Sequence, residues 1–189
     1  MILNPYNTHS RTVKTYRVLR FCSAKGCCMD FCFCTEDGEV KFDGAISREE
    51  ADALKYLYCG EKSKATLVAT YFYQLYLSGE HDKCIKDELK CFLLSEIQSM
   101  TAVKNAIEFF GGNVALYSRQ GFWRAKWMNF GTDVKMFLKD DLVLEKECIV
   151  MMISICKKTQ NKSLKEFLRK LIADEELNMR LLENLISRV

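Results

Sequence analysis

The sequence predicts an all-α protein, a bundle of four long helices preceded by a short extended arm. The only proline is Pro5, so no proline interrupts a helix later in the chain. Apolar residues recur at helical spacing over long stretches. Capping boxes at residues 47–50 and 163–166 indicate two helix starts. The chain of 189 residues, 49% of them apolar, is long enough for one well-packed domain, residues 45–189, behind the arm.

The amino-terminal arm, residues 1–44, has a different composition. Residues 15–21 and 30–35 are rich in β-branched and aromatic side chains, which favour strands. Asp37 and Gly38 form a turn signal ahead of residues 40–42. The arm is therefore expected to be extended or a small β-hairpin.

Five of the ten cysteines lie in this arm: Cys22, Cys27, Cys28, Cys32 and Cys34. Their spacing lacks the paired C-x-x-C pattern of zinc and rubredoxin-type iron sites. We expect reduced thiols that pack beside Phe31 and Phe33, with a bound metal as the alternative.

The remaining sequence divides into four helices and one long connection. The helices are expected at residues 47–78, 82–110, 132–158 and 163–189, and the aromatic connection at residues 113–131. A connection of that length is typical of a crossover between two parallel helices, which gives an up-down-down-up bundle. The crossover is expected to pack on the bundle.

Each helix carries one charged residue on its apolar stripe: Lys64, Glu96, Glu145 or Glu175. Such a residue can lie at the edge of the stripe and reach water, as long charged side chains often do. The recurrence of the pattern in all four helices favours the other interpretation, in which the four groups meet in the core. Buried charges need partners, so a metal ion, a cation or a retained proton is expected among them.

These motifs resemble the ferritin-like superfamily of di-metal carboxylate four-helix bundles, which includes bacterioferritins, rubrerythrins and manganese-catalase-like proteins. The resemblance covers residues 51–186. It rests on the Asp-Leu-x-x-Glu pattern ending at Glu145, on Asp-Glu-x-x-Asn around Glu175, and on Glu96 placed sixteen residues before Gly112. It also includes Tyr58-Cys59-Gly60, the Gly111-Gly112 helix end and Trp127-Met128-Asn129-Phe130-Gly131. The resemblance implies that Glu96, Glu145 and Glu175 are remnants of a metal-ligand set.

Three positions depart from the family pattern. Ser99 and Asn178 stand where the family has histidines, and Lys64 stands where the first helix has a glutamate. The two histidines of the chain, His9 and His81, lie outside the helical stripes. We interpret Lys64 as a replacement for the positive charge of the metal, in a degenerate site. A local shift that presents Glu61, one turn earlier, is the alternative, and it would create an oxygen-only site for a hard ion.

Two functions remain open on the sequence. The first is a structural or interaction module without a cofactor, acting as a homodimer or other homo-oligomer. The second is a rubrerythrin-like metal-dependent oxidoreductase, an oxidase or peroxidase, with iron or manganese in an altered carboxylate site. The net charge of +3 has no basic cluster that would indicate nucleic acid. No apolar run approaches the roughly 18 residues of a membrane span. No signal peptide is evident, so a cytoplasmic location is expected.

Overall fold

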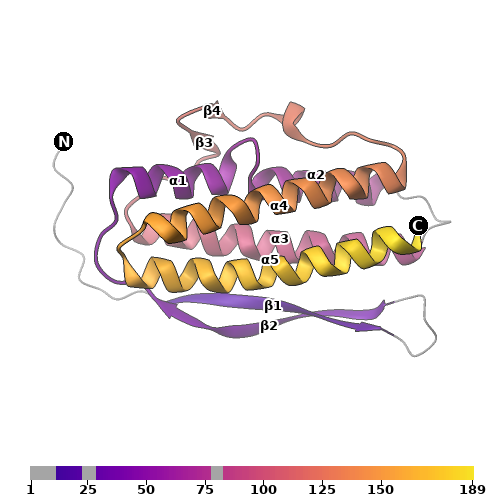
Figure 1. Cartoon of the computed structure of the whole chain (residues 1–189), viewed down its shortest axis with the longest axis horizontal. Helices are drawn as coiled ribbons and strands as arrows, with labels where there is room; N and C mark the ends of the chain where they lie inside the picture. Colours follow the sequence, from indigo (N-terminus) through magenta and orange to yellow (C-terminus); the bar gives the residue numbers. More distant parts are fainter. Residues whose placement is uncertain (1–11, 23–28, 78–82) are drawn as a thin grey trace.

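The computed structural model describes residues 12–22, 29–77 and 83–189, and it is a four-helix bundle with a β-hairpin against one side (Figure 1). The helices are α1 (Arg48–Cys59), α2 (Lys64–Leu77), α3 (Lys83–Phe109), α4 (Val134–Lys158) and α5 (Lys162–Arg188). Helices α1 and α2 follow one another along one side of the bundle and together make its first helix (Figure 1). The predicted fold class is confirmed.

The helix order is up-down-down-up, as expected. In Figure 1, α3 and α4 run in the same direction, opposite to α1, α2 and α5. The crossover between α3 and α4 contains β3 (Tyr117–Ser118), β4 (Gly121–Phe122) and the short helix η2 (Ala125–Trp127). The indole N–H of Trp123 donates to Thr66 Oγ1 at 3.0 Å, and the backbone N–H of Asn129 donates to Thr70 Oγ1 at 3.3 Å. The crossover therefore packs along α2.

The expected single helix at residues 47–78 is wrong, because it breaks between Cys59 and Lys64. At the break, the Thr66 hydroxyl donates to the carbonyl of Gly60 at 3.2 Å. Ser63 Oγ accepts from the backbone N–H of Thr66 at 3.4 Å. These hydroxyls satisfy backbone groups that the interrupted helix leaves without helical partners.

One of the two expected capping boxes is present. Ser47 Oγ accepts from the N–H of Glu50 at 3.2 Å, and the Glu50 carboxylate accepts from the N–H of Ser47 at 2.6 Å. The second box, at residues 163–166, is wrong, because Asn161 is the N-cap of α5 and accepts from Leu164 N–H at 2.8 Å. Ser163 lies inside the first turn of α5.

The arm is a β-hairpin, in which β1 (Thr12–Cys22) pairs antiparallel with β2 (Met29–Lys41). The hairpin lies along α3 and α5 (Figure 1). The expected turn at Asp37 and Gly38 is wrong, since β2 continues through both residues. Thr15 pairs with Gly38 and Tyr16 with Glu36, so Asp37 is the extra residue of a β-bulge. The side chains of the arm cysteines lie outside the described part of the structure.

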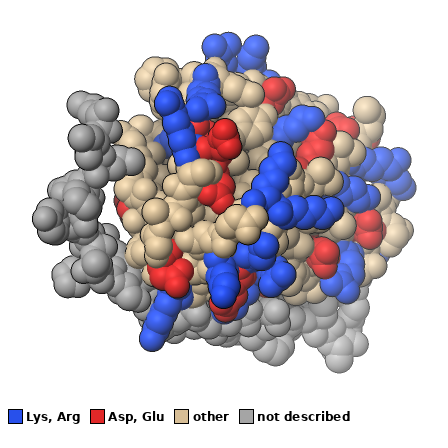
Figure 2. Space-filling model, turned by 60° about the vertical axis from the view of Figure 1, so that its left-hand side comes forward, with Lys and Arg blue, Asp and Glu red and all other residues tan. Residues whose placement is uncertain are grey.

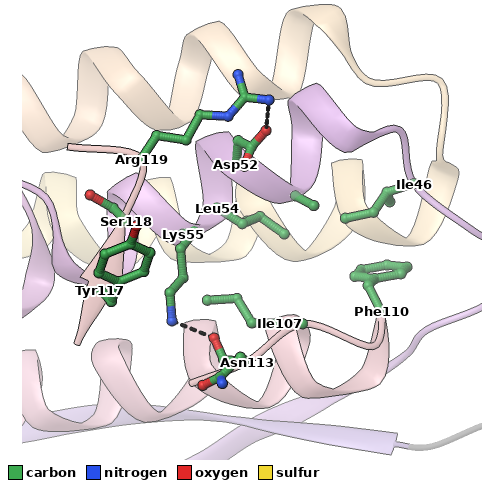
Figure 3. Close-up of a pocket in the computed structure, with 12 residues that line it drawn as sticks. Ile46, Asp52, Leu54, Lys55, Ile107, Phe110, Asn113, Tyr117, Ser118 and Arg119 are labelled. Atoms are coloured by element: carbon green, nitrogen blue, oxygen red, sulfur yellow. Dashed lines mark hydrogen bonds and ion pairs between the residues drawn. The ribbon is translucent and has the colours of Figure 1, made fainter. Parts of the chain in front are cut away.

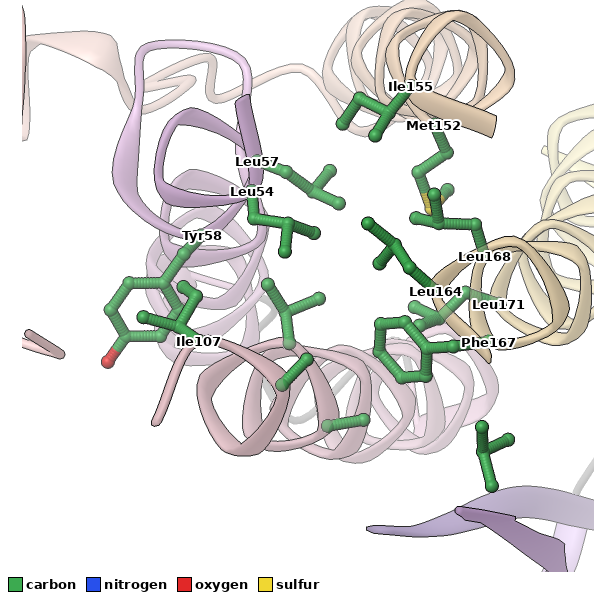
Figure 4. Packing of buried hydrophobic residues seen from close by; sticks show 14 of the residues in the cluster. Leu54, Leu57, Tyr58, Ile107, Met152, Ile155, Leu164, Phe167, Leu168 and Leu171 are labelled. Carbon is green, nitrogen blue, oxygen red and sulfur yellow. The ribbon is translucent and has the colours of Figure 1, made fainter. Parts of the chain in front are cut away.

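The core consists of two apolar clusters on either side of a polar layer. One cluster joins α1 to the ends of α3 and α4 and the start of α5, and Figure 4 shows Leu54, Ile107, Met152 and Phe167 within it. The other joins α2 to the opposite ends of the same helices, around Tyr71 and other buried residues. Charged side chains that point into the bundle at this level therefore lie between two apolar clusters.

The surface carries both signs of charge. On the face in Figure 2, lysine and arginine side chains are interspersed with aspartate and glutamate. Within the described residues, no helix is long and apolar enough to cross a bilayer.

Candidate functional site

The polar layer between the two apolar clusters contains four charged residues, one from the inward stripe of each helix of the bundle. Lys64 is the first residue of α2, Glu96 lies in α3, Glu145 in α4 and Glu175 in α5. All four residues have an exposed fraction of 0%. The alternative that these groups reach water at the edges of their stripes is therefore wrong.

Lys64 is paired with two of the three carboxylates. Its Nζ lies 2.7 Å from Glu175 Oε1 and 3.0 Å from Glu96 Oε2. The third carboxylate, Glu145, accepts a hydrogen bond of 2.9 Å from the hydroxyl of Tyr71. Because α2 begins at Lys64, the helix break places this ammonium at the level of the carboxylates on the other three helices.

The two positions where the family has histidines also contribute polar contacts. Ser99 Oγ donates to Glu175 Oε1 at 2.9 Å, so Ser99 belongs to the cluster. Asn178 Nδ2 donates to Ser95 Oγ at 2.8 Å, which ties α5 to α3 beside it. Glu61 is exposed in the break between α1 and α2, where it lines a surface pocket with Lys62. The structure does not bring Glu61 into the cluster.

The pKa values of the three carboxyl groups move apart. Burial, followed by the charge of Glu175, raises the pKa of Glu96 to about 8. Burial also raises the pKa of Glu145 well above its ordinary value, and the charges of Glu96 and Glu175 act in the same direction. Burial would raise the pKa of Glu175 too, but the Lys64 ammonium and hydrogen bonds from neighbouring groups lower it.

Lys64 stays charged in this environment. Burial alone would lower the pKa of its ammonium, but the charge of Glu175, followed by those of Glu96 and Glu145, raises it well above the ordinary value. The environment therefore favours the charged forms of Lys64 and Glu175, and burial favours the protonated forms of Glu96 and Glu145.

One oxygen of each carboxyl group in the cluster lacks a donor from outside the three. Glu96 Oε1, Glu145 Oε2 and Glu175 Oε2 are buried, and no other donor in the described part of the chain reaches them. Glu96 and Glu145 each hydrogen-bond with Glu175, and both contacts lower the pKa of Glu175. A carboxylic proton on each of Glu96 and Glu145 would satisfy oxygens that otherwise repel one another.

Sequence reasoning missed a second buried polar contact beside the cluster. Gln74 Nε2 donates to Asp141 Oδ1 at 2.9 Å, and Asn129 Nδ2 approaches the same oxygen at 3.4 Å. Burial raises the pKa of Asp141 to about 7, although these two hydrogen bonds lower it. The signal was present, because Gln74 follows Tyr71 by three residues and Asp141 precedes Glu145 by four.

The helix order and the long crossover match solved four-helix bundles, and the chain has the ferritin-like fold. Two crystal structures of KatB, a manganese catalase from Anabaena, superpose with TM-scores of 0.70 and 0.71 at 19% identity. Each superposition covers 77% of this chain and 74% of KatB. A bacterioferritin from Rhodobacter capsulatus superposes with a TM-score of 0.61 at 19% identity, over 76% of this chain and 87% of the other.

The likeness is structural. No protein-family model matches the sequence, and no curated protein matches it. At 19% identity the superpositions establish the fold, and function depends on the residues of the site.

The residues of the cluster do not fit a pair of transition-metal ions. One ligand atom from each of Glu96, Glu145 and Glu175 lies within 4.8 Å of the others, so three oxygen ligands are available. Among the described residues, no imidazole accompanies them. The ammonium of Lys64 already contacts two of the three, and it would repel a second cation. The donor set therefore suits an internal cation better than iron or manganese.

Proposed function

We propose that this protein is a ferritin-like bundle without di-metal chemistry, which acts as a structural or interaction module. The observation that carries the proposal is the fully buried Lys64 ammonium, 2.7 Å from Glu175 and 3.0 Å from Glu96. In this proposal Glu96, Glu145 and Glu175 are remnants of a ligand set, and Lys64 replaces the charge of the metal.

Charge and coordination both support this proposal. A metal entering the cluster would have to displace the ammonium from two carboxylates and remove the carboxylic protons. The displaced Lys64 side chain would remain buried without its partners, which is costly. Ser99 and Asn178 would offer the metal a hydroxyl and an amide in place of two imidazoles, and these are poorer ligands for iron or manganese.

The test is metal analysis of protein purified without chelators, followed by titration of the protein with Mn²⁺ and Fe²⁺ under anaerobic conditions. We expect no stoichiometric metal after purification and no saturable binding in the titration. A matched Lys64→Met variant reports whether the ammonium blocks the site. Two tightly bound metal equivalents in the parent protein would overturn the proposal.

One observation favours a second candidate, a single hard cation bound by the three carboxylates. Their ligand oxygens lie close enough to share one ion. Such a site would bind one equivalent of Ca²⁺, Mg²⁺ or Mn²⁺, and Glu175→Gln would abolish the binding. The other alternative is a rubrerythrin-like oxidase or peroxidase. It would be supported if one preparation of the protein both contains a redox metal and turns over peroxide.

We also propose that the protein self-associates through the outer face of α2. Phe72 is 54% exposed and Tyr76 is 80% exposed, and their ring centroids lie 5.4 Å apart. Exposed aromatic pairs on a helix surface are typical of protein interfaces. Light scattering should give a dimer or larger mass, and Tyr76→Glu should lower it, whereas a monomeric parent would refute self-association. The cytoplasmic location remains a prediction, which fractionation of cells would test.

A further inference from the structure

A pocket of about 280 Å³ lies where α1 faces the end of α3 (Figure 3), and none of its lining residues belongs to the Lys64 cluster. It is formed by α1, the end of α3 and the β3 segment of the crossover. One side is apolar, formed by Ile46, Ala51, Leu54, Ile107 and Phe110. In Figure 3 the labelled side chains of Ile46 and Phe110 lie across the pocket from Tyr117 and Ser118. Because Tyr117 is 51% exposed, the pocket opens to solvent on the crossover side.

Lys55 gives the pocket a positive charge. Its ammonium donates to the backbone carbonyls of Asn113 and Ala115 and lies 5.3 Å from the ring centroid of Tyr58. Within the described part of the chain, no carboxylate forms an ion pair with Lys55. Partial burial lowers the pKa of Lys55, as expected for an ammonium whose partners are neutral.

The Lys55 ammonium has one N–H donor more than the two carbonyls accept. A lysine side chain carries three N–H donors, and the two carbonyls of the crossover use two of them. Among the described residues these two carbonyls are the recorded acceptors of Lys55, so its third donor can reach a ligand. A carboxylate would add a charge-assisted hydrogen bond, which is stronger than one between neutral groups.

The other charged groups of the pocket set its charge balance. Arg119 pairs with Asp52 across the mouth, and its side chain is 60% exposed. Lys55, Arg119 and Asp52 are the charged residues of the lining, so the pocket carries one net positive charge. A ligand with one negative charge would make the site neutral.

We propose that this pocket binds a small monocarboxylate with an apolar body. The carboxylate contacts Lys55, and the hydrocarbon lies against Leu54, Ile107 and Phe110. The volume lies near the lower limit of known ligand pockets, roughly 300 Å³, so a medium-chain acid fits and a membrane lipid does not. The pocket shares no residue with the Lys64 cluster, so this proposal can fail while the proposed function stands, and the reverse.

The experiment titrates the full chain with octanoate by calorimetry and compares octanol and octylamine, which have the same chain length. We expect saturable one-to-one binding of octanoate, with octanol about tenfold weaker because it lacks the charge-assisted hydrogen bond. Octylamine should not saturate, because its ammonium meets Lys55. No octanoate binding up to roughly 10 mM, or equal binding of octanol or octylamine, would overturn the proposal.

Two variants locate the site. Ala51→Phe places a ring in the pocket and should weaken octanoate by about tenfold or more, through steric exclusion. Ala53→Phe is the matched control, because Ala53 lies on the same helix and lines a different pocket, beside α4. It should leave the affinity unchanged, with thermal unfolding as the check that both variants fold.

Lys55→Met tests the charge. Octanoate and octanol should then bind equally, because the variant keeps the apolar wall and loses the ammonium. If Lys55→Met does not fold, Ala51→Phe still decides the question. Full octanoate affinity in Ala51→Phe, or continued preference for octanoate over octanol in Lys55→Met, would refute the assignment.

Discussion

Replacing Lys64 with methionine is the most direct test of the internal cation. Methionine keeps an unbranched apolar chain but removes the ammonium that lies 2.7 Å from Glu175 and 3.0 Å from Glu96. Breaking a buried ion pair by removing one partner costs about 3–5 kcal/mol. Since small domains are stable by about 5–15 kcal/mol, the variant should lose a large part of its free energy of unfolding.

The loss should depend on pH in a defined direction. In the parent, the pKa of Glu175 is below its ordinary value of 4.5, so its ionised form stabilises the fold above that pH. Without the ammonium, burial raises the pKa of Glu175, and the folded variant must keep a third proton. As pH rises from the unfolded pKa of Glu175 towards its raised folded pKa, the variant loses about 1.4 kcal/mol of stability per pH unit. The free energy of unfolding of the variant should therefore be far below that of the parent at pH 8 and nearer to it at pH 5.

The assay is urea unfolding of parent and variant at pH 5 and pH 8, followed by circular dichroism. Lys62→Met is the control. Lys62 lies two positions before Lys64 in the sequence and forms an exposed ion pair with Glu147. Exposed pairs contribute little, so this control should show no measurable change. Equal unfolding midpoints for the parent and Lys64→Met at pH 8 would refute the view that the ammonium compensates buried charge.

Three further predictions concern the cluster and the crossover. The triple variant Lys64→Glu, Ser99→His, Asn178→His restores the family ligand set and should bind iron or manganese in elemental analysis where the parent does not; a metal-free triple variant would contradict the family register. Glu96 has its pKa raised from 4.5 to about 8, so the folded state holds a proton that the unfolded state has lost, and stability should fall as pH rises across this range. Glu96→Gln mimics the protonated group and should remove that part of the decline in urea unfolding, whereas an unchanged pH profile would show that Glu96 is ionised. Trp123→Phe removes the indole donor that ties the crossover to α2 and should cost about 1 kcal/mol by thermal unfolding, so an unaltered midpoint would contradict that contact.

The bundle and its inward charges could be predicted because they depend on local spacing. Residues three and four positions apart share a helix face, so Lys64, Glu96, Glu145 and Glu175 could be assigned to inward stripes one helix at a time. The crossover followed from its length alone. Neither inference needed knowledge of distant contacts.

The features that were wrong depend on contacts between distant parts of the chain. Ser163 does not cap α5, because its hydroxyl accepts from the backbone N–H of Asp43 at 3.1 Å. Asn161 Nδ2 donates to the carbonyl of the same residue at 2.8 Å. The break before Lys64 is supported by Trp123 from the crossover, which donates to Thr66. Local patterns cannot predict these helix ends, because the deciding partners lie far away in the sequence.

The sequence also could not predict which carboxyl groups of the site are protonated. Three carboxylates and one ammonium leave two negative charges, but the pattern alone cannot say which groups take up protons. The structure separates the three groups by their donors, because Glu175 Oε1 accepts from both Lys64 and Ser99. Glu96 accepts from Lys64 alone and Glu145 from the Tyr71 hydroxyl. These contacts lower the pKa of Glu175, whereas burial raises the pKa values of Glu96 and Glu145.

In the proposed function, charge from the chain and the solvent stands in for the charge of a metal. In the family pattern, four carboxylates balance two divalent ions. Under the proposal, a lysine at the position of one carboxylate changes this balance by two charges. Protons on Glu96 and Glu145, which burial favours, would supply the remaining two. Protons are available in any compartment, so folding of this bundle should not depend on metal supply. The dependence moves to pH instead, because a rise in pH through about 8 removes the proton from Glu96 beside the Glu175 carboxylate. A bundle of this kind should therefore be insensitive to chelators and sensitive to alkali, the opposite of one whose core is held by metal.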